Sequence, residues 1–113
     1  MATQTIRSGS DAKFRLNFTD ADGNAMQPKD CDFIISFFTA RSNKVTVAHR
    51  AGDAMPAGMS VDGNTLVIAL DRPNFAPGNL RMIVTTRIED ADFPDKYYNV
   101  SSGEIETGIE VLQ

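Results

Sequence analysis

Two residues of this chain, Cys31 and His49, have side chains that often take part in catalysis or metal binding, and each is the only residue of its type. A thiolate activated by an imidazole can act as a nucleophile, so a small enzyme would need Cys31, His49 and a carboxylate to converge. No nucleophile-elbow or oxyanion motif accompanies them. Zinc needs more ligands than one cysteine and one histidine. We therefore predict no catalytic, cofactor-binding or metal-binding residue, and interpret both side chains as structural.

A second candidate site is the acidic segment EDADFPD, residues 89–95. Its carboxylates are the oxygen ligands that calcium prefers, although their spacing matches no standard calcium loop. The alternative is a solvated connection between two strands, in which Phe93 is an anchor. Tyr97 and Tyr98 follow, and aromatic rings can bind sugars, but adjacent residues of a strand face opposite ways. We predict a connecting loop, with a carbohydrate- or calcium-binding module that uses residues 89–98 as the alternative.

The segment DADGNA, residues 20–25, also begins like a calcium loop, because acidic and amide side chains alternate in it. An EF-hand would need glycine at the position of Ala25 and glutamate at the position of Cys31. Both are absent, and the flanking residues are patterned as strands. Gly23 instead predicts a tight turn, since glycine readily adopts positive φ.

The elements that would position these residues alternate apolar and polar side chains with a period of two, which is typical of half-buried strands. In KFRLNF, for example, Phe14 and Leu16 point to one side. The segments with this pattern are residues 13–18, 31–39, 44–50, 65–70, 79–88, 96–100 and 104–111. Residues 51–59 and 71–78, which contain glycine and proline, are expected to be loops. About seven strands predict one domain, residues 1–113, folded as an antiparallel β-sandwich, with a small barrel as the alternative.

The pairing of the last strands can be predicted from charge. If NLRMIVTTRI and EIETGIEV are antiparallel neighbours, one register sets Arg87 opposite Glu104. The same register sets Arg81 opposite Glu110. Opposite-charge cross-strand pairs contribute about 0.2–1 kcal/mol each and help to define the register. A competing hairpin pairs KYYNV with the end of NLRMIVTTRI and has a bulge at SSG. We favour the first register.

Charge and composition exclude several function classes. The net charge is −4, whereas nucleic-acid-binding domains usually carry a basic stripe. Residues 1–88 hold 10 basic and 8 acidic side chains, a balance of +2, and residues 89–113 hold 1 basic and 7 acidic, a balance of −6. No apolar run approaches the ~20 residues that span a bilayer, and the first residues lack the apolar stretch of a signal peptide. We expect synthesis in the cytoplasm, no membrane insertion and no nucleic-acid partner.

The outward rows of the predicted strands carry four large apolar side chains, at Ile34, Phe38, Val67 and Ile83. In one interpretation the long loops at residues 51–63 and 71–78 cover them. In the other they form a patch that a protein partner covers. We favour a homo-oligomer or a contact with another subunit. The predicted partner-contact residues are Ile34, Phe38, Phe93 and Tyr98.

The layout resembles an immunoglobulin-like domain. The strand TLVIAL, the loop DRPNFAPG and the strand NLRMIVTTRI resemble the corner between strands E and F of that fold. There a Pro-Gly pair precedes a large inward residue, usually tyrosine. Here Pro77 and Gly78 are followed one residue later by Leu80, which has no hydroxyl for a tyrosine corner. The resemblance implies an immunoglobulin-like β-sandwich, but the chain lacks the Cys–Trp–Cys set of antibody domains.

Two longer segments, RSGSDAKFRLNFTDADGNAM and APGNLRMIVTTRIEDADFPDKYYNV, are similar to small phage or prophage tail and baseplate proteins. In those proteins an early G-D-x-F-x-L strand leads to a D-x-x-G turn, and a later G-x-L strand leads to an F-P-D loop. The first motif matches loosely at residues 9–14, and Lys96 replaces the glycine of F-P-D-G. The chain also resembles the N-terminal immunoglobulin-like domain of siphophage baseplate upper proteins. The resemblance implies a structural or attachment role in the virion, through contacts with itself or other tail subunits, and no catalytic residue.

Overall fold

The computed structural model describes residues 4–19, 22–40 and 44–113 of the chain. These residues form strands and one short 3₁₀ turn, η1 (Pro28–Asp30), with no α-helix among them, which confirms the predicted all-β class. The strands are β1 (Gln4–Arg7), β2 (Ala12–Asn17), β3 (Asp32–Phe38), β4 (Val45–His49), β5 (Met59–Asp62), β6 (Thr65–Leu70), β7 (Gly78–Glu89) and β8 (Tyr97–Leu112). In this described part of the chain, no helix is long and apolar enough to cross a membrane.

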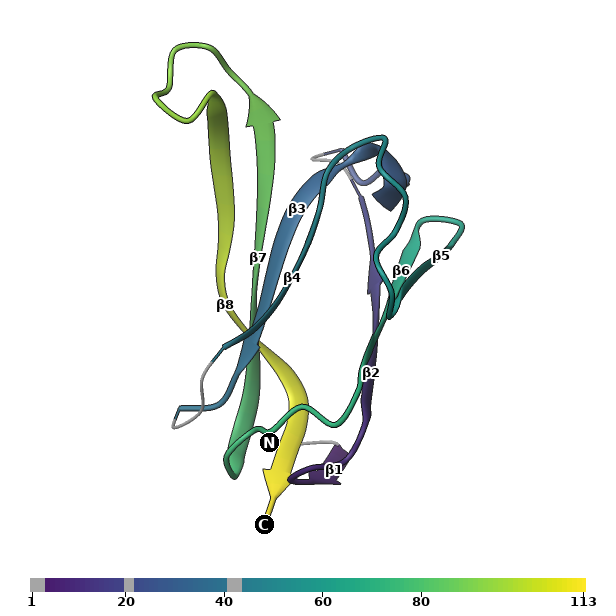
Figure 1. Cartoon of the computed structure of the whole chain (residues 1–113), viewed down its shortest axis with the longest axis vertical. Helices are drawn as coiled ribbons and strands as arrows, with labels where there is room; N and C mark the ends of the chain where they lie inside the picture. The colour runs from purple at the N-terminus through teal and green to yellow at the C-terminus, as the bar shows by residue number, and fades with distance from the viewer. Residues whose placement is uncertain (1–3, 20–21, 41–43) are drawn as a thin grey trace.

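The strands form two sheets with an apolar core between them, which is the sandwich-like arrangement that the sequence predicts (Figure 1). One sheet has the order β1-β8-β7-β3-β4 and the other the order β2-β6-β5. One pairing corrects the antiparallel prediction, because β1 runs parallel to β8, with Gln4 beside Ile109 and Arg7 beside Leu112. β1 has only 4 residues and is mostly exposed, so it carries no apolar alternation that would predict it.

The period-two pattern of the sequence accounts for the core. In β3 Ile35 and Phe37 are fully buried, and Leu66 and Ile68 of β6 join them from the other sheet. The rings of Phe14 and Phe37 stack across the two sheets with their centroids 4.3 Å apart. Burying one such side chain contributes about 1.5–3 kcal/mol, so these rows hold the sheets together.

The favoured register of the last two strands is wrong, and the competing hairpin is confirmed. KYYNV pairs with the end of β7, and the register shifts at SSG. Arg87 therefore lies beside Asn99 rather than Glu104. Arg81 lies beside Glu106, and its guanidinium reaches diagonally to the Glu104 carboxylate at 2.9 Å. The hairpin keeps the backbone of KYYNV in the ladder, whereas the favoured register would leave its N–H and C=O groups without a sheet partner.

The hairpin of β7 and β8 is longer than the second sheet that it faces. β8 alone has 16 residues and joins KYYNV and EIETGIEV, which were expected as two strands. Figure 1 shows the upper end of the hairpin projecting beyond β2, β5 and β6. The second sheet also contains β5, which lies inside the residues expected to form the long loop 51–63. The projecting end of the hairpin is therefore a sheet face that no second layer of the described residues covers (Figure 1).

The turn predicted within residues 20–25 falls partly outside the described residues. On its two sides Thr19 and Ala25 form an isolated antiparallel bridge. Gly23 has a φ of 85°, which is the left-handed conformation that glycine favours. The described part of this segment therefore agrees with a tight turn.

Candidate functional site

The candidate site is a set of exposed apolar side chains on the β7–β8 hairpin. Among the described residues, the large hydrophobic side chains that are exposed are Phe93 (39%), Tyr98 (47%), Val100 (45%) and Ile105 (38%). We call these four residues the hairpin face. Ile105 lies beside Met82, whose side chain points into the core, and Val100 lies beside Thr86. The hairpin face is thus the inward side of the long sheet, continued past the end of the second sheet.

Two aromatic rings at the tip of the hairpin pack on each other. The centroids of Phe93 and Tyr98 are 5.6 Å apart, with the rings edge to face. Such pairs contribute about 0.5–1.5 kcal/mol beyond the area that they bury. This contact keeps Phe93 on the same side of the sheet as Tyr98, so the tip extends the hairpin face.

A groove opens next to the hairpin face, between the end of β2 and the inner side of β7 and β8. Its volume is about 290 Å³, and apolar side chains form most of its wall, including Leu16, Phe18, Met26, Val84 and Ile105. Ile105 belongs to both the groove and the hairpin face. The two features therefore form one continuous apolar surface.

The outer edge of β8 beside this surface is not covered by another strand. β1 pairs only with residues Ile109–Leu112 of β8. From Tyr97 to Glu106, β7 is the one strand neighbour that β8 has within the described chain. Uncovered edges of this kind present backbone N–H and C=O groups that can pair with another strand.

The predicted contact residues divide into two groups in the structure. Phe93 and Tyr98 are exposed and touch each other, as described above. Phe38 is 9% exposed, and the ammonium of Lys44 lies 5.3 Å from the centre of its ring. Ile34 is half-buried in β3, between β4 and β7. The chain itself therefore buries Phe38, as in the first interpretation of the outward apolar residues. Ile34 and Phe38 do not belong to the hairpin face.

Sequence reasoning did not select Val100 and Ile105 of the hairpin face. They belong to segments that were expected as separate strands, and the register shift between them changes which side chains share a face. The competing register, with its bulge at SSG, could have predicted that both residues lie on the inward side of the hairpin. In that register both residues lie opposite inward residues of β7.

The carboxylates of the acidic loop are used to shape its turn. The backbone N–H of Asp92 donates to Asp90 Oδ1 at 3.0 Å. Asp95 accepts from the backbone N–H of Tyr97 at 3.1 Å and from the Asn99 amide at 3.3 Å. The Tyr97 bond, with the Asn99 bond second, lowers the pKa of Asp95 below its ordinary value. No group of three or more His, Cys, Asp and Glu within the described ranges is arranged to hold a metal ion.

Tyr97 and Tyr98 have separate environments, as expected for neighbours on a strand. The Tyr97 hydroxyl accepts a hydrogen bond from the Arg50 guanidinium at 2.8 Å. The guanidinium of Arg87 lies 4.4 Å from the centre of the Tyr97 ring. Tyr98 instead contacts Phe93. The two tyrosines therefore do not form a single platform for a sugar ring.

Cys31 and His49 are neighbours, but not as a nucleophile and its base. His49 is 4% exposed, and its Nδ1 and Nε2 lie 2.9 Å from the backbone carbonyl oxygens of Cys31 and Asp53. Both ring nitrogens therefore face backbone carbonyl oxygens and not the Cys31 thiol. The Cys31 thiol points to the carbonyl of Gln27 at 3.5 Å. Burial, followed by the nearby Asp30 and Asp32, raises the pKa of this thiol, which disfavours the thiolate.

Comparisons with known proteins add no family. A scan against protein-family models finds no match for this chain. A search of curated proteins finds no match either. Function is therefore inferred from the hairpin face, the groove and the uncovered edge of β8.

Proposed function

We propose that this chain is a non-enzymatic structural or interaction domain that works through protein–protein contacts of the hairpin face. The observation that carries the proposal is that the exposed large apolar side chains of the described chain all lie on one hairpin, beside an apolar groove. Contiguous apolar surface on a soluble protein commonly marks an interaction site. Aromatic anchors such as Phe93 and Tyr98 supply much of the binding energy at such sites.

The proposed topology is immunoglobulin-like. Immunoglobulin domains place strands C, F and G in one sheet and strands A, B, E and D in the other. If β2, β3, β5, β6, β7 and β8 correspond to B, C, D, E, F and G, the neighbours G-F-C and B-E-D follow the observed order of both sheets. Leu80, at the position of the corner tyrosine, is 1% exposed. The strand order and this inward corner residue support the proposal.

The proposed setting is the tail or baseplate of a phage or prophage. Its support is the resemblance of the two long segments to small tail proteins, together with the backbone at Lys96. Lys96 stands where the resembled F-P-D-G motif has glycine, and its φ is 68°. Positive φ is the conformation in which glycine is favoured. The loop therefore keeps the backbone geometry that the glycine of the motif would supply.

Recovery of the chain in particles tests this proposal. A tagged chain is expressed in its native host, and particle production is induced. We expect mass spectrometry to detect the chain in purified particles that contain tails. Val100→Lys should reduce its incorporation, because the charge lies in the hairpin face. Ser60→Lys, on the exposed edge of β5, is the matched control and should be incorporated normally. Absence of the wild-type chain from particles, with no virion genes beside its own gene, contradicts the proposal.

A further inference from the structure

We propose that the hairpin face binds a second copy of this chain, through antiparallel pairing of the two β8 edges centred on Asn99. This inference rests on the proposed function, since it names the partner of the same surface. An edge strand that pairs with its own copy in antiparallel orientation forms a two-fold contact, in which each residue meets its counterpart reciprocally.

The positions of the exposed apolar residues are self-complementary about Asn99. Tyr98 and Val100 lie one position to either side, so antiparallel pairing sets Tyr98 of one copy opposite Val100 of the other. Both side chains lie on the inward side of the hairpin, so the pair continues the apolar surface from one copy to the other. One register thus pairs the two residues of the hairpin face that lie in β8 before the bulge at SSG. Aromatic and β-branched cross-strand pairs contribute about 0.2–1 kcal/mol each in addition to the area that they bury.

The groove lies on the same surface as the paired edges. Ile105 lines the groove together with Leu16, Phe18 and Met26. Phe93 is held on the same side of the sheet as Tyr98 by their ring contact. In the paired dimer the grooves and the tip rings of both copies therefore lie on the same side of one continuous sheet.

Charge around the edge is compatible with a second copy. Residues 97–103, YYNVSSG, carry no charge, so the central part of the edges meets without repulsion. Lys96 lies directly before this stretch and Glu104 directly after it, so antiparallel pairing brings the Lys96 end of one copy toward the Glu104 end of the other. Opposite charges at the two ends of the paired segment favour the antiparallel orientation.

A cysteine scan tests the register directly. In a Cys31→Ser background, Asn99→Cys places a thiol on the proposed two-fold axis. Directly opposed strand residues have Cα atoms about 4.5–5.5 Å apart, which suits a disulfide. We expect Asn99→Cys to form a disulfide-linked dimer under mild oxidation at least tenfold faster than Ser60→Cys, the control on the exposed edge of β5. Equal rates for the two variants would overturn the register.

Solution mass tests the dimer itself. Sedimentation of the wild-type chain is expected to show a concentration-dependent dimer, and Val100→Lys should weaken it at least tenfold with an unchanged melting temperature. Ser60→Lys should dimerise like the wild type. A wild-type chain that stays monomeric up to millimolar concentration would refute the dimer. If that monomer is still incorporated into particles and Val100→Lys reduces the incorporation, the proposed interaction domain is retained and a second copy as its partner is excluded. If the dimer forms but particles never contain the chain, the dimer is retained and the proposed place in a phage tail is rejected.

Discussion

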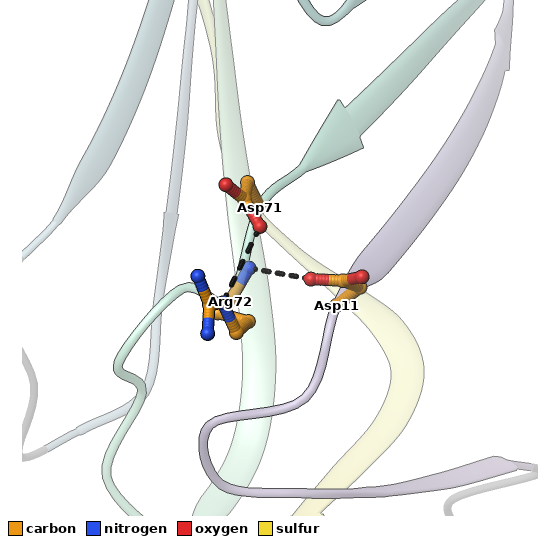
Figure 2. A network of polar contacts seen from close by, with 3 residues as sticks. All are labelled: Asp11, Asp71 and Arg72. Carbon is orange, nitrogen blue, oxygen red and sulfur yellow. Dashed lines mark hydrogen bonds and ion pairs between the residues drawn. The ribbon is translucent and has the colours of Figure 1, made fainter.

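The Asp11 carboxylate accepts a hydrogen bond from the backbone N–H of Arg72 at 2.8 Å, although 61 positions separate the two residues (Figure 2). Asp11 precedes β2, and Arg72 follows β6, the antiparallel neighbour of β2. Arg72 has a φ of 45°, which is uncommon for a residue with a side chain, and its Nε lies 3.5 Å from Asp71 Oδ1. The bond to Asp11 therefore fastens a strained turn to the start of the neighbouring strand.

Replacing Asp11 should loosen this turn. Asp11→Ala removes the acceptor of the Arg72 N–H, and we expect the free energy of unfolding to fall by about 1 kcal/mol in urea titrations. Asp62→Ala, which removes another exposed aspartate without this bond, is the control and should change stability by less than about 0.5 kcal/mol. Equal effects of the two substitutions would mean that the bond does not stabilise the fold.

Lys96→Gly should stabilise the hairpin. Lys96 has a φ of 68°, a conformation that costs a residue with a side chain about 1–2 kcal/mol. Glycine removes this cost but adds freedom to the unfolded chain, so the expected net gain is about 0.5–1 kcal/mol. Lys13→Gly in β2, where the backbone is extended, should instead destabilise. A lower melting temperature for Lys96→Gly would contradict the expectation.

His49→Phe should destabilise the domain strongly. The phenylalanine ring retains the contact with the neighbouring Phe33 ring but leaves the carbonyl oxygens of Cys31 and Asp53 without the imidazole. Both contacts are part-buried, and a ring with a single N–H donates to only one carbonyl at a time, so the expected loss is about 1–3 kcal/mol. Thr46→Ser on the exposed side of the same strand is the control, because it keeps the hydroxyl that bonds to Ser36 Oγ. Chemical denaturation of the three proteins measures the difference, and a loss equal to that of Thr46→Ser would show that the histidine bonds are dispensable.

The acidic loop should loosen at low pH. The pKa of Asp95 is lowered in the folded chain, first by the Tyr97 N–H and then by the Asn99 amide. A lowered carboxyl pKa contributes stability that is fully present above the unfolded-state pKa of about 3.9 and is lost as pH falls through the folded-state pKa. We expect the Tyr97 amide proton to lose protection relative to its intrinsic exchange rate, and to shift in NMR spectra, as the pH falls below about 4. In Asp95→Asn this transition should disappear; its persistence would assign it to another group.

The interior of the fold follows from the sequence, because one physical pattern determines it. Alternation at Phe14, Ile35 and Ile68 requires one face of each strand to be buried, and all three side chains are in the core. A one-residue slip would expose the whole row, so the inward parity of these strands is strongly specified.

The pairing of β7 and β8 does not follow from the charges that were used to predict it. Cross-strand ion pairs contribute too little to decide between registers, and Arg81 reaches Glu104 diagonally even in the register that the charges disfavoured. The bulge at SSG then decides which residues form the hairpin face. Phe93 and Tyr98 could be selected from their residue types, whereas Val100 and Ile105 depend on the bulge and on where the second sheet ends.

The parallel pair of β1 and β8 affects how the domain would respond to tension. Gln4 opens β1 beside Ile109, and Leu112 closes β8 beside Arg7. A pull applied between the two ends of the chain would slide these strands past each other along their length. All the bonds between them would then be loaded together in shear rather than opened one at a time. The strength of the domain under force would accordingly depend on the rate at which this short ladder ruptures, because forced unfolding is governed by the unfolding rate rather than by equilibrium stability.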